Sequence, residues 1–181
     1  VTGAAATTLN IASTGSANKV GTFTGPTTVT SHVITGDKAL AYSPAAADVA
    51  ALNSINASAT TGGITVNANA GLTKAAFTFA GGTGNDTITF VTDEFGTLTA
   101  GTQLTGGTGT DKIGLFDTAL TAAEATKIQA ASGFEKIGLN AAITLDASTL
   151  SNYKTFDVDT TALTQVINNL ATGSTVNVGV G

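Results

Sequence analysis

The sequence predicts an all-β chain folded as a parallel β-solenoid, or β-helix, with short helical insertions. Threonine, valine and isoleucine combined with 22 glycines favour short strands ended by turns. Apolar residues make up 42% of the chain, which is enough for a real core. Short runs that alternate between apolar and polar residues also recur at nearly constant intervals, which indicates a stacked repeat.

The recurring runs form a ladder along the sequence. Each run has only four to six residues of period two, too few to bury a face alone, so the runs are expected to stack. Their first apolar residues are Leu40, Ile64, Ile88, Ile113, Ile137, Phe156 and Val176, at steps of 24, 24, 25, 24, 19 and 20 residues. These steps match solenoid coils of about 20–25 residues. A sequential β-sandwich is the main structural alternative.

The strands are expected in the following order. Those of the ladder cover 38–42, 63–67, 86–90, 111–115, 135–139, 154–158 and 174–178. Others lie between them, at 7–12, 29–34, 75–80 and 142–147. Each coil therefore has at least two strands, and polar Thr and Asn alternating with Val, Ile and Phe give each strand one inward and one outward face.

Two short helices are expected, each ahead of a ladder strand. The first follows Ser43 as the cap, has Pro44 at its first position and ends near Asn53. The second starts with a capping box formed by Thr121 and Glu124 and ends at a glycine, at position 133.

Composition and charge exclude some classes of partner. The formal net charge is −5 and arginine is absent, which argues against a nucleic-acid partner because phosphates are neutralised by clustered Lys and Arg. Cysteine is also absent, which fits an exported chain without disulfides. No apolar run approaches the length of a membrane span. Residues 1–181 are expected to form a single solenoid domain, a piece of a longer surface protein, since the first residue is Val1.

Two glycine-rich turns are the strongest functional signal. GGTGNDTITF begins at residue 81 and GGTGTDKIGL begins 25 residues later, at 106. The glycines allow positive φ, so that carbonyl oxygens can point into the turn, and the aspartate adds a negative charge. Ca²⁺ takes six to eight oxygens, which one turn cannot supply, but two turns stacked one coil apart could share an ion. The expected metal ligands are Gly81, Gly82, Gly84, Asp86, Gly106, Gly107, Gly109 and Asp111. The alternative is a pair of structural glycine turns with a local aspartate.

The two turns resemble the repeat-in-toxin nonapeptide GGxGxDxUx, with Ile88 and Ile113 at its apolar position. This resemblance implies extracellular calcium, type I secretion and a parallel β-roll that folds when calcium binds. The chain departs from the family in having two copies 25 residues apart instead of nonapeptides in tandem. The next ladder strand keeps a carboxylate at Glu135 without the glycines, and is not assigned a site.

Phrases along the whole chain, such as ITGDKALAYS and SGFEKIGLNAAITLDASTL, resemble bacterial S-layer proteins of the repeat-in-toxin type. The resemblance implies a secreted structural protein that assembles with itself into a calcium-dependent lattice on the cell surface. Anchoring to a surface glycan or lipopolysaccharide would be through parts outside this chain. The alternatives are a calcium-binding adhesin, or a solenoid module of a type I-secreted exoprotein or polysaccharide-acting enzyme.

Catalysis is not expected from this sequence. The chain has one histidine, His32, two tyrosines and no arginine, so a catalytic array is hard to assemble. The remaining acidic residues that could be ligands are interpreted as turn or strand-end residues: Asp37, Asp93, Glu94, Asp117, Asp146, Asp157 and Asp159.

Overall fold

The regular secondary structure is mainly parallel β-sheet, with few helices. The computed structural model describes residues 5–26, 28–68, 74–91, 94–160 and 163–179. A five-stranded sheet has the order β1-β3-β5-β7-β9, an eight-stranded sheet has the order β15-β13-β11-β10-β8-β6-β4-β2, and β12 pairs with β14. Every strand pair recorded in these ranges is parallel, whereas a β-sandwich of consecutive hairpins would be antiparallel.

The strands are short. The five-stranded sheet contains β1 (Thr8–Ser13), β3 (Ser31–Gly36), β5 (Ser54–Thr60), β7 (Thr78–Ala80) and β9 (Leu104–Thr105). The eight-stranded sheet contains β2 (Asn18–Phe23), β4 (Leu40–Pro44), β6 (Ile64–Ala68), β8 (Thr87–Phe90), β10 (Lys112–Leu115), β11 (Lys136–Leu139), β13 (Thr155–Val158) and β15 (Thr175–Val178). The two-stranded sheet contains β12 (Thr144–Asp146) and β14 (Val166–Asn168).

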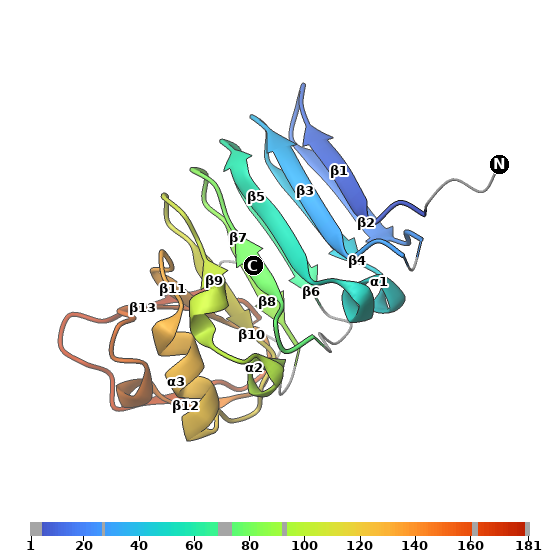
Figure 1. Ribbon diagram of the computed structural model, residues 1–181. Helices are drawn as coiled ribbons and strands as arrows, with labels where there is room; N and C mark the ends of the chain where they lie inside the picture. Colours follow the sequence, from blue (N-terminus) through green and yellow to red (C-terminus); the bar gives the residue numbers. More distant parts are fainter. Residues whose placement is uncertain (1–4, 27, 69–73, 92–93, 161–162, 180–181) are drawn as a thin grey trace.

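From β1 to β10 the chain alternates between the two large sheets. One strand of the five-stranded sheet, together with the strand that follows it in the eight-stranded sheet, is called a unit below. Successive units lie side by side, as Figure 1 shows from β1 and β2 to β9 and β10. Connections from the five-stranded to the eight-stranded sheet therefore all lie along one edge of the stack. This edge carries both glycine-rich turns.

Most of the predicted ladder is confirmed by the strand register. Leu40 pairs with Ile64, and Ile113 pairs with both Ile88 and Ile137. The ladder then continues through Phe156 to Val176. The predicted pairing of Ile64 with Ile88 is wrong, because Val66 is the residue that pairs with Ile88. The spacing between these two paired strands is therefore two residues shorter than predicted, and the same side chains still face inward.

Three helices and one 3₁₀ turn lie in the opposite connections, which leave the eight-stranded sheet. They are α1 (Ala46–Ala51), α2 (Glu94–Thr97), α3 (Ala122–Ala130) and the 3₁₀ turn η1 (Gly101–Gln103). A second 3₁₀ turn, η2 (Ala147–Leu150), joins β12 to β13. The predicted capping box of α3 is confirmed: Glu124 N–H donates to Thr121 Oγ1 at 3.3 Å, and Thr121 N–H donates to Glu124 Oε2 at 2.9 Å. The expected start of α1 is wrong, since Ser43 and Pro44 end β4 and Ala45 is the N-cap.

The core is a single apolar cluster between the two large sheets. Inward side chains of successive units stack in columns, and Ile88 and Phe90 of β8 are completely buried. Phe90 also packs on Phe95, with ring centroids 4.6 Å apart. Each buried side chain of this size contributes about 1.5–3 kcal/mol. The core therefore holds adjacent units together and fixes the turns at their edge.

Candidate cation site

The two glycine-rich turns lie directly on one another. Residues 81–86 join β7 to β8, and residues 106–111 join β9 to β10. The flanking strands pair Ala80 with Thr105 and Thr87 with Lys112, so the turns are in register. The Thr108 N–H donates to the Gly82 carbonyl oxygen at 2.9 Å. The stacking expected from the 25-residue spacing is therefore present.

The glycines serve mainly to let the turns approach closely. A Cβ on Gly81 would overlap the carbonyl oxygen of Gly106, and a Cβ on Gly106 would overlap that of Gly133. Of the motif glycines, Gly107 (φ 103°) and Gly109 (φ 143°) use the positive φ that glycine allows, and the others do not. The Gly106 carbonyl oxygen lies against Gly81 of the preceding turn. Gly82 and Gly84 similarly contact backbone atoms of the preceding unit.

Three acidic side chains form a row along this edge. Asp86 Oδ1 accepts from Ile64 N–H at 2.7 Å, Asp111 Oδ1 accepts from Asp86 N–H at 2.6 Å, and Glu135 Oε2 accepts from Asp111 N–H at 2.8 Å. Each carboxylate thus binds the backbone of the preceding unit. Asp86 and Asp111 are completely buried, whereas Glu135 is exposed. Glu135 was not assigned to the site from the sequence, yet it continues the row.

The two aspartates differ in their second carboxylate oxygen. Asp86 Oδ2 accepts from Gly82 N–H at 2.7 Å, so both of its oxygens are bonded. Asp111 Oδ2 is buried and has no hydrogen-bond partner in the part of the chain that the structure describes. At the position equivalent to Gly82, Gly107 has a left-handed backbone. Asp111 is therefore the member of the row that could accept a cation.

The electrostatic environment of Asp111 also favours a cation. Burial raises the pKa of Asp111 to about 6; the N–H of Asp86 opposes this, and the negative charges of Asp86 and Glu135 add to it. The pKa of Asp86 is also raised by burial, against the hydrogen bonds from Ile64 and Gly82. A proton or a metal ion bound at Asp111 would offset the free-energy cost of burying its negative charge.

A pH titration follows from the raised pKa of Asp111. The group binds its proton more readily in the folded than in the unfolded chain, where its pKa is near 3.8. Its contribution to stability is therefore fully present below about pH 4 and is lost as the pH rises through about 6. In chelator, we expect the melting temperature of Asp111→Asn to vary less than wild type between pH 4 and 7. Equal pH dependence of the two proteins would contradict the assignment.

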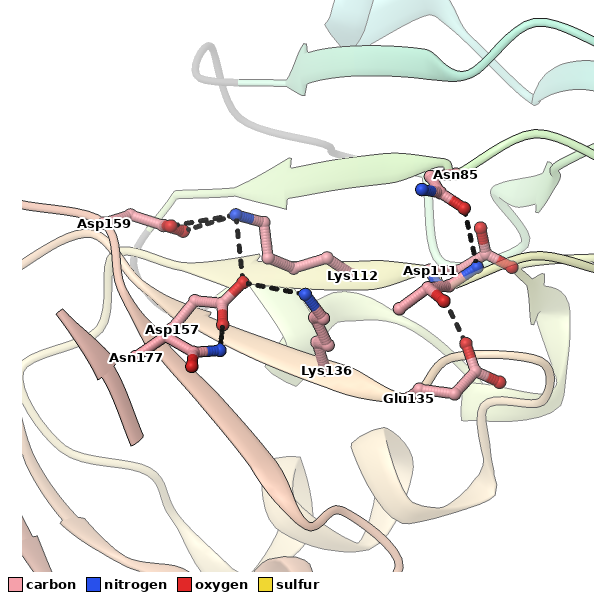
Figure 2. A network of polar contacts seen from close by, with 9 residues as sticks. Asn85, Asp111, Lys112, Glu135, Lys136, Asp157, Asp159 and Asn177 are labelled. Atoms are coloured by element: carbon pink, nitrogen blue, oxygen red, sulfur yellow. Dashed lines mark hydrogen bonds and ion pairs between the residues drawn. The ribbon is translucent and has the colours of Figure 1, made fainter. Parts of the chain in front are cut away.

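A second polar cluster lies on the outward face of the eight-stranded sheet (Figure 2). Lys112 Nζ lies 2.8 Å and 3.0 Å from the two carboxylate oxygens of Asp159. Asp157 Oδ2 is 3.7 Å from the ammonium groups of both Lys112 and Lys136, and Asp157 Oδ1 accepts from Asn177 at 2.7 Å. These two aspartates were interpreted from the sequence as strand-end residues. The structure instead places them in an ion-pair network, which is called the lysine–aspartate network below.

The other candidate residues are structural or lie outside the described ranges. His32 is buried, its Nδ1 lies 3.2 Å from the Tyr42 hydroxyl, and burial lowers its pKa. Asp37 is an exposed partner of Lys38. Asp93 lies outside the described residues. Within those residues, no three His, Cys, Asp or Glu side chains converge as metal ligands, so further ligands at Asp111 would be backbone carbonyls or water.

Comparisons with family models, with curated proteins and with solved structures gave no match. A search of the described residues also found no helix with the length and apolar character needed to span a membrane.

Proposed function

We propose that this chain is a structural, calcium-stabilised module of a bacterial surface layer, folded as a parallel β-solenoid of the repeat-in-toxin type. The observation that carries the proposal is the carboxylate row, in which Asp111 Oδ2 is buried without a partner. Burial raises the pKa of Asp111, and the negative charges of Asp86 and Glu135, which lie one unit away on either side, raise it further. A divalent cation would offset this negative charge and supply the absent partner.

The proposed role is mechanical and not catalytic. Parallel units that bind one another through backbone and core contacts can form a rigid wall. The only histidine is packed against Tyr42 and Phe23 in the core, which supports a structural role. In this proposal the protein is secreted by the type I route, assembles with itself at the cell surface, and is anchored to a glycan or lipopolysaccharide by parts outside this chain.

Calcium would act by linkage between binding and folding. An ion that binds the folded turns and not the unfolded chain stabilises the fold by RT ln(1 + [L]/Kd), or about 1–3 kcal/mol at ten- to hundredfold excess over Kd. Binding also requires an ionised Asp111. The stabilisation is therefore expected to be large at pH 7.5 and to fade as the pH falls below about 6, where protons compete with the metal.

The test is a set of thermal melts followed by circular dichroism, in calcium or in chelator, at pH 7.5. Wild type should melt several degrees higher with calcium. Asp111→Asn should lose this gain, because the neutral amide cannot supply the anionic oxygen. Asp37→Asn is the matched control, since it removes the same charge from an exposed residue. Equal melting of wild type in calcium and in chelator would refute the calcium proposal.

Surface-layer assembly needs a separate measurement. Purified protein in calcium should form ordered sheets that are visible by negative-stain electron microscopy, and chelator should disperse them. Discrete monomers at every calcium concentration would argue for the adhesin or exoprotein alternative, even if the melting experiment succeeds.

A further inference from the structure

The outward face of the eight-stranded sheet contains two adjoining cavities that the cation proposal does not use. The first, about 250 Å³, is lined by Asn85, Thr87, Thr110, Lys112, Lys136 and Asp157. The second, about 320 Å³, is lined by Thr65, Asn67, Thr87, Thr89, Lys112, Asn140 and Asp159. Thr87 and Lys112 belong to both linings. The two cavities, which lie on the outward sides of β6, β8, β10, β11 and β13, are together called the polar groove below.

Two glycines explain why this part of the sheet is hollow. Gly114 and Gly138 are paired on neighbouring strands and alternate with inward-facing isoleucine and leucine, so they lie on the outward face. A Cβ on Gly114 would lie 2.9 Å from the Asn140 amide nitrogen, and one on Gly138 would overlap Asp159 Oδ2. Asn140 and Asp159 can therefore lie over the sheet and form the groove wall.

The walls are held in place by polar contacts. The lysine–aspartate network joins β10, β11 and β13, and the side chains of Asp157 and Asp159 are only 5% and 7% exposed. Asn85 Oδ1 accepts from Thr110 N–H at 2.9 Å, which fixes the amide with its NH₂ as the donor at the cavity wall. Side chains that are already ordered lose little entropy when a ligand binds.

The chemistry of the lining selects the class of ligand. The two lysines are balanced by two aspartates, so the groove has no net charge to attract a phosphate or a polyanion. Every lining residue carries an amide, a hydroxyl, a carboxylate or an ammonium group, so polar groups lie beside the carbon atoms of the threonine and lysine side chains throughout the groove. Closely spaced donors and acceptors of this kind match a ligand with many hydroxyl groups.

We propose that this groove binds a neutral saccharide, with Asn67, Asn140 and Lys112 as its contacts to sugar hydroxyls. The proposal does not depend on a bound cation: the carboxylates of Asp86, Asp111 and Glu135 are not part of the lining, although Asn85 and Thr110 of the same two turns are. The lining contains no aromatic ring on which a sugar face could stack, so affinity is set by hydrogen bonds. We expect a dissociation constant on the order of 1 mM for a single sugar unit.

Two-dimensional ¹H–¹⁵N NMR in calcium-free buffer tests the proposal. The probes are the methyl glycosides of glucose, galactose, mannose and N-acetylglucosamine, with glucuronic acid and inorganic phosphate as charged comparisons. At least one neutral glycoside should shift the amide signals of Lys112, Gly114 and Asn140 in a saturable way. No saturable shift with any neutral glycoside, or shifts caused only by glucuronic acid or phosphate, would overturn the proposal.

Substitutions in the groove then test which residues contact the saccharide. Asn140→Ala and Asn67→Ala should each weaken binding about five- to tenfold, the effect of one lost hydrogen bond. Asn56→Ala is the matched control, because Asn56 is an exposed asparagine of β5 in the other large sheet, and its affinity should equal that of wild type. The spectrum of each variant reports whether it is folded. Unchanged affinity in both folded groove variants, or an equal loss in the control, would overturn the assignment.

Discussion

Gly106→Ala is expected to destabilise the protein by about 3 kcal/mol or more. The added Cβ would overlap the carbonyl oxygen of Gly133 in the next turn and would come within 2.8 Å of Asp111 Oδ2. The Gly133 carbonyl oxygen is a backbone atom, which cannot rotate away as a side chain could. The measurement is the urea midpoint and slope of unfolding, compared with wild type.

Gly21→Ala is the matched control for this substitution. Gly21 lies in β2, its φ is not positive, and a Cβ there would meet no atom within 4 Å. Its stability should lie within about 0.5 kcal/mol of wild type. If Gly106→Ala were as stable as Gly21→Ala, the turns could not be packed backbone against backbone.

Asp86→Ala is expected to cost about 2–4 kcal/mol, because it leaves two buried N–H groups, those of Ile64 and Gly82, without an acceptor. Asp111→Ala should cost less, since it removes only one hydrogen bond, from Asp86 N–H, and also relieves the burial of an unpartnered oxygen. Thermal and urea unfolding in chelator would rank the two variants. The opposite order would contradict the division of roles between them.

The response to calcium is expected to differ between variants of Asp86 and variants of Asp111. Asp86 has both oxygens bonded to backbone N–H groups, so we assign it mainly to the fold, and we assign Asp111 to the ion. Asp86→Asn keeps one of the two acceptor oxygens, and its folded form should keep part of the calcium response, whereas Asp111→Asn should lose it. If the two turns shared one ion equally, as the 25-residue spacing suggested, both replacements would weaken binding to the same extent.

The local sequence pattern was sufficient to predict several features of this protein. Alternating apolar residues predicted most ladder strands, and the capping box of Thr121 and Glu124 predicted the start of α3. Strands with a weaker pattern, such as β5 and β9, were not predicted. β5 contains SINASAT, in which alanine and serine give little contrast between inward and outward residues, and β9 has only two residues.

The register error between β6 and β8 has a simple cause. Side chains alternate with a period of two, so a shift of two residues leaves every apolar side chain on the same face. The repeat pattern therefore could not distinguish Ile64 from Val66 as the partner of Ile88. The structure decides the register through the turn, where Ile64 N–H binds the Asp86 carboxylate.

Composition and local spacing predict that this chain is mostly β, that its strands repeat at solenoid-like intervals, and that two glycine turns stack. These features depend on composition and on residues close together in the chain. The roles of the acidic residues, by contrast, follow from the tertiary structure. The partners of Asp86, Asp111 and Glu135 in neighbouring units lie 22 to 25 residues away, and Asp159 reaches Lys112 across 47 residues. Such pairs are set by how the units stack, because burial and charge depend on neighbours that no local pattern specifies.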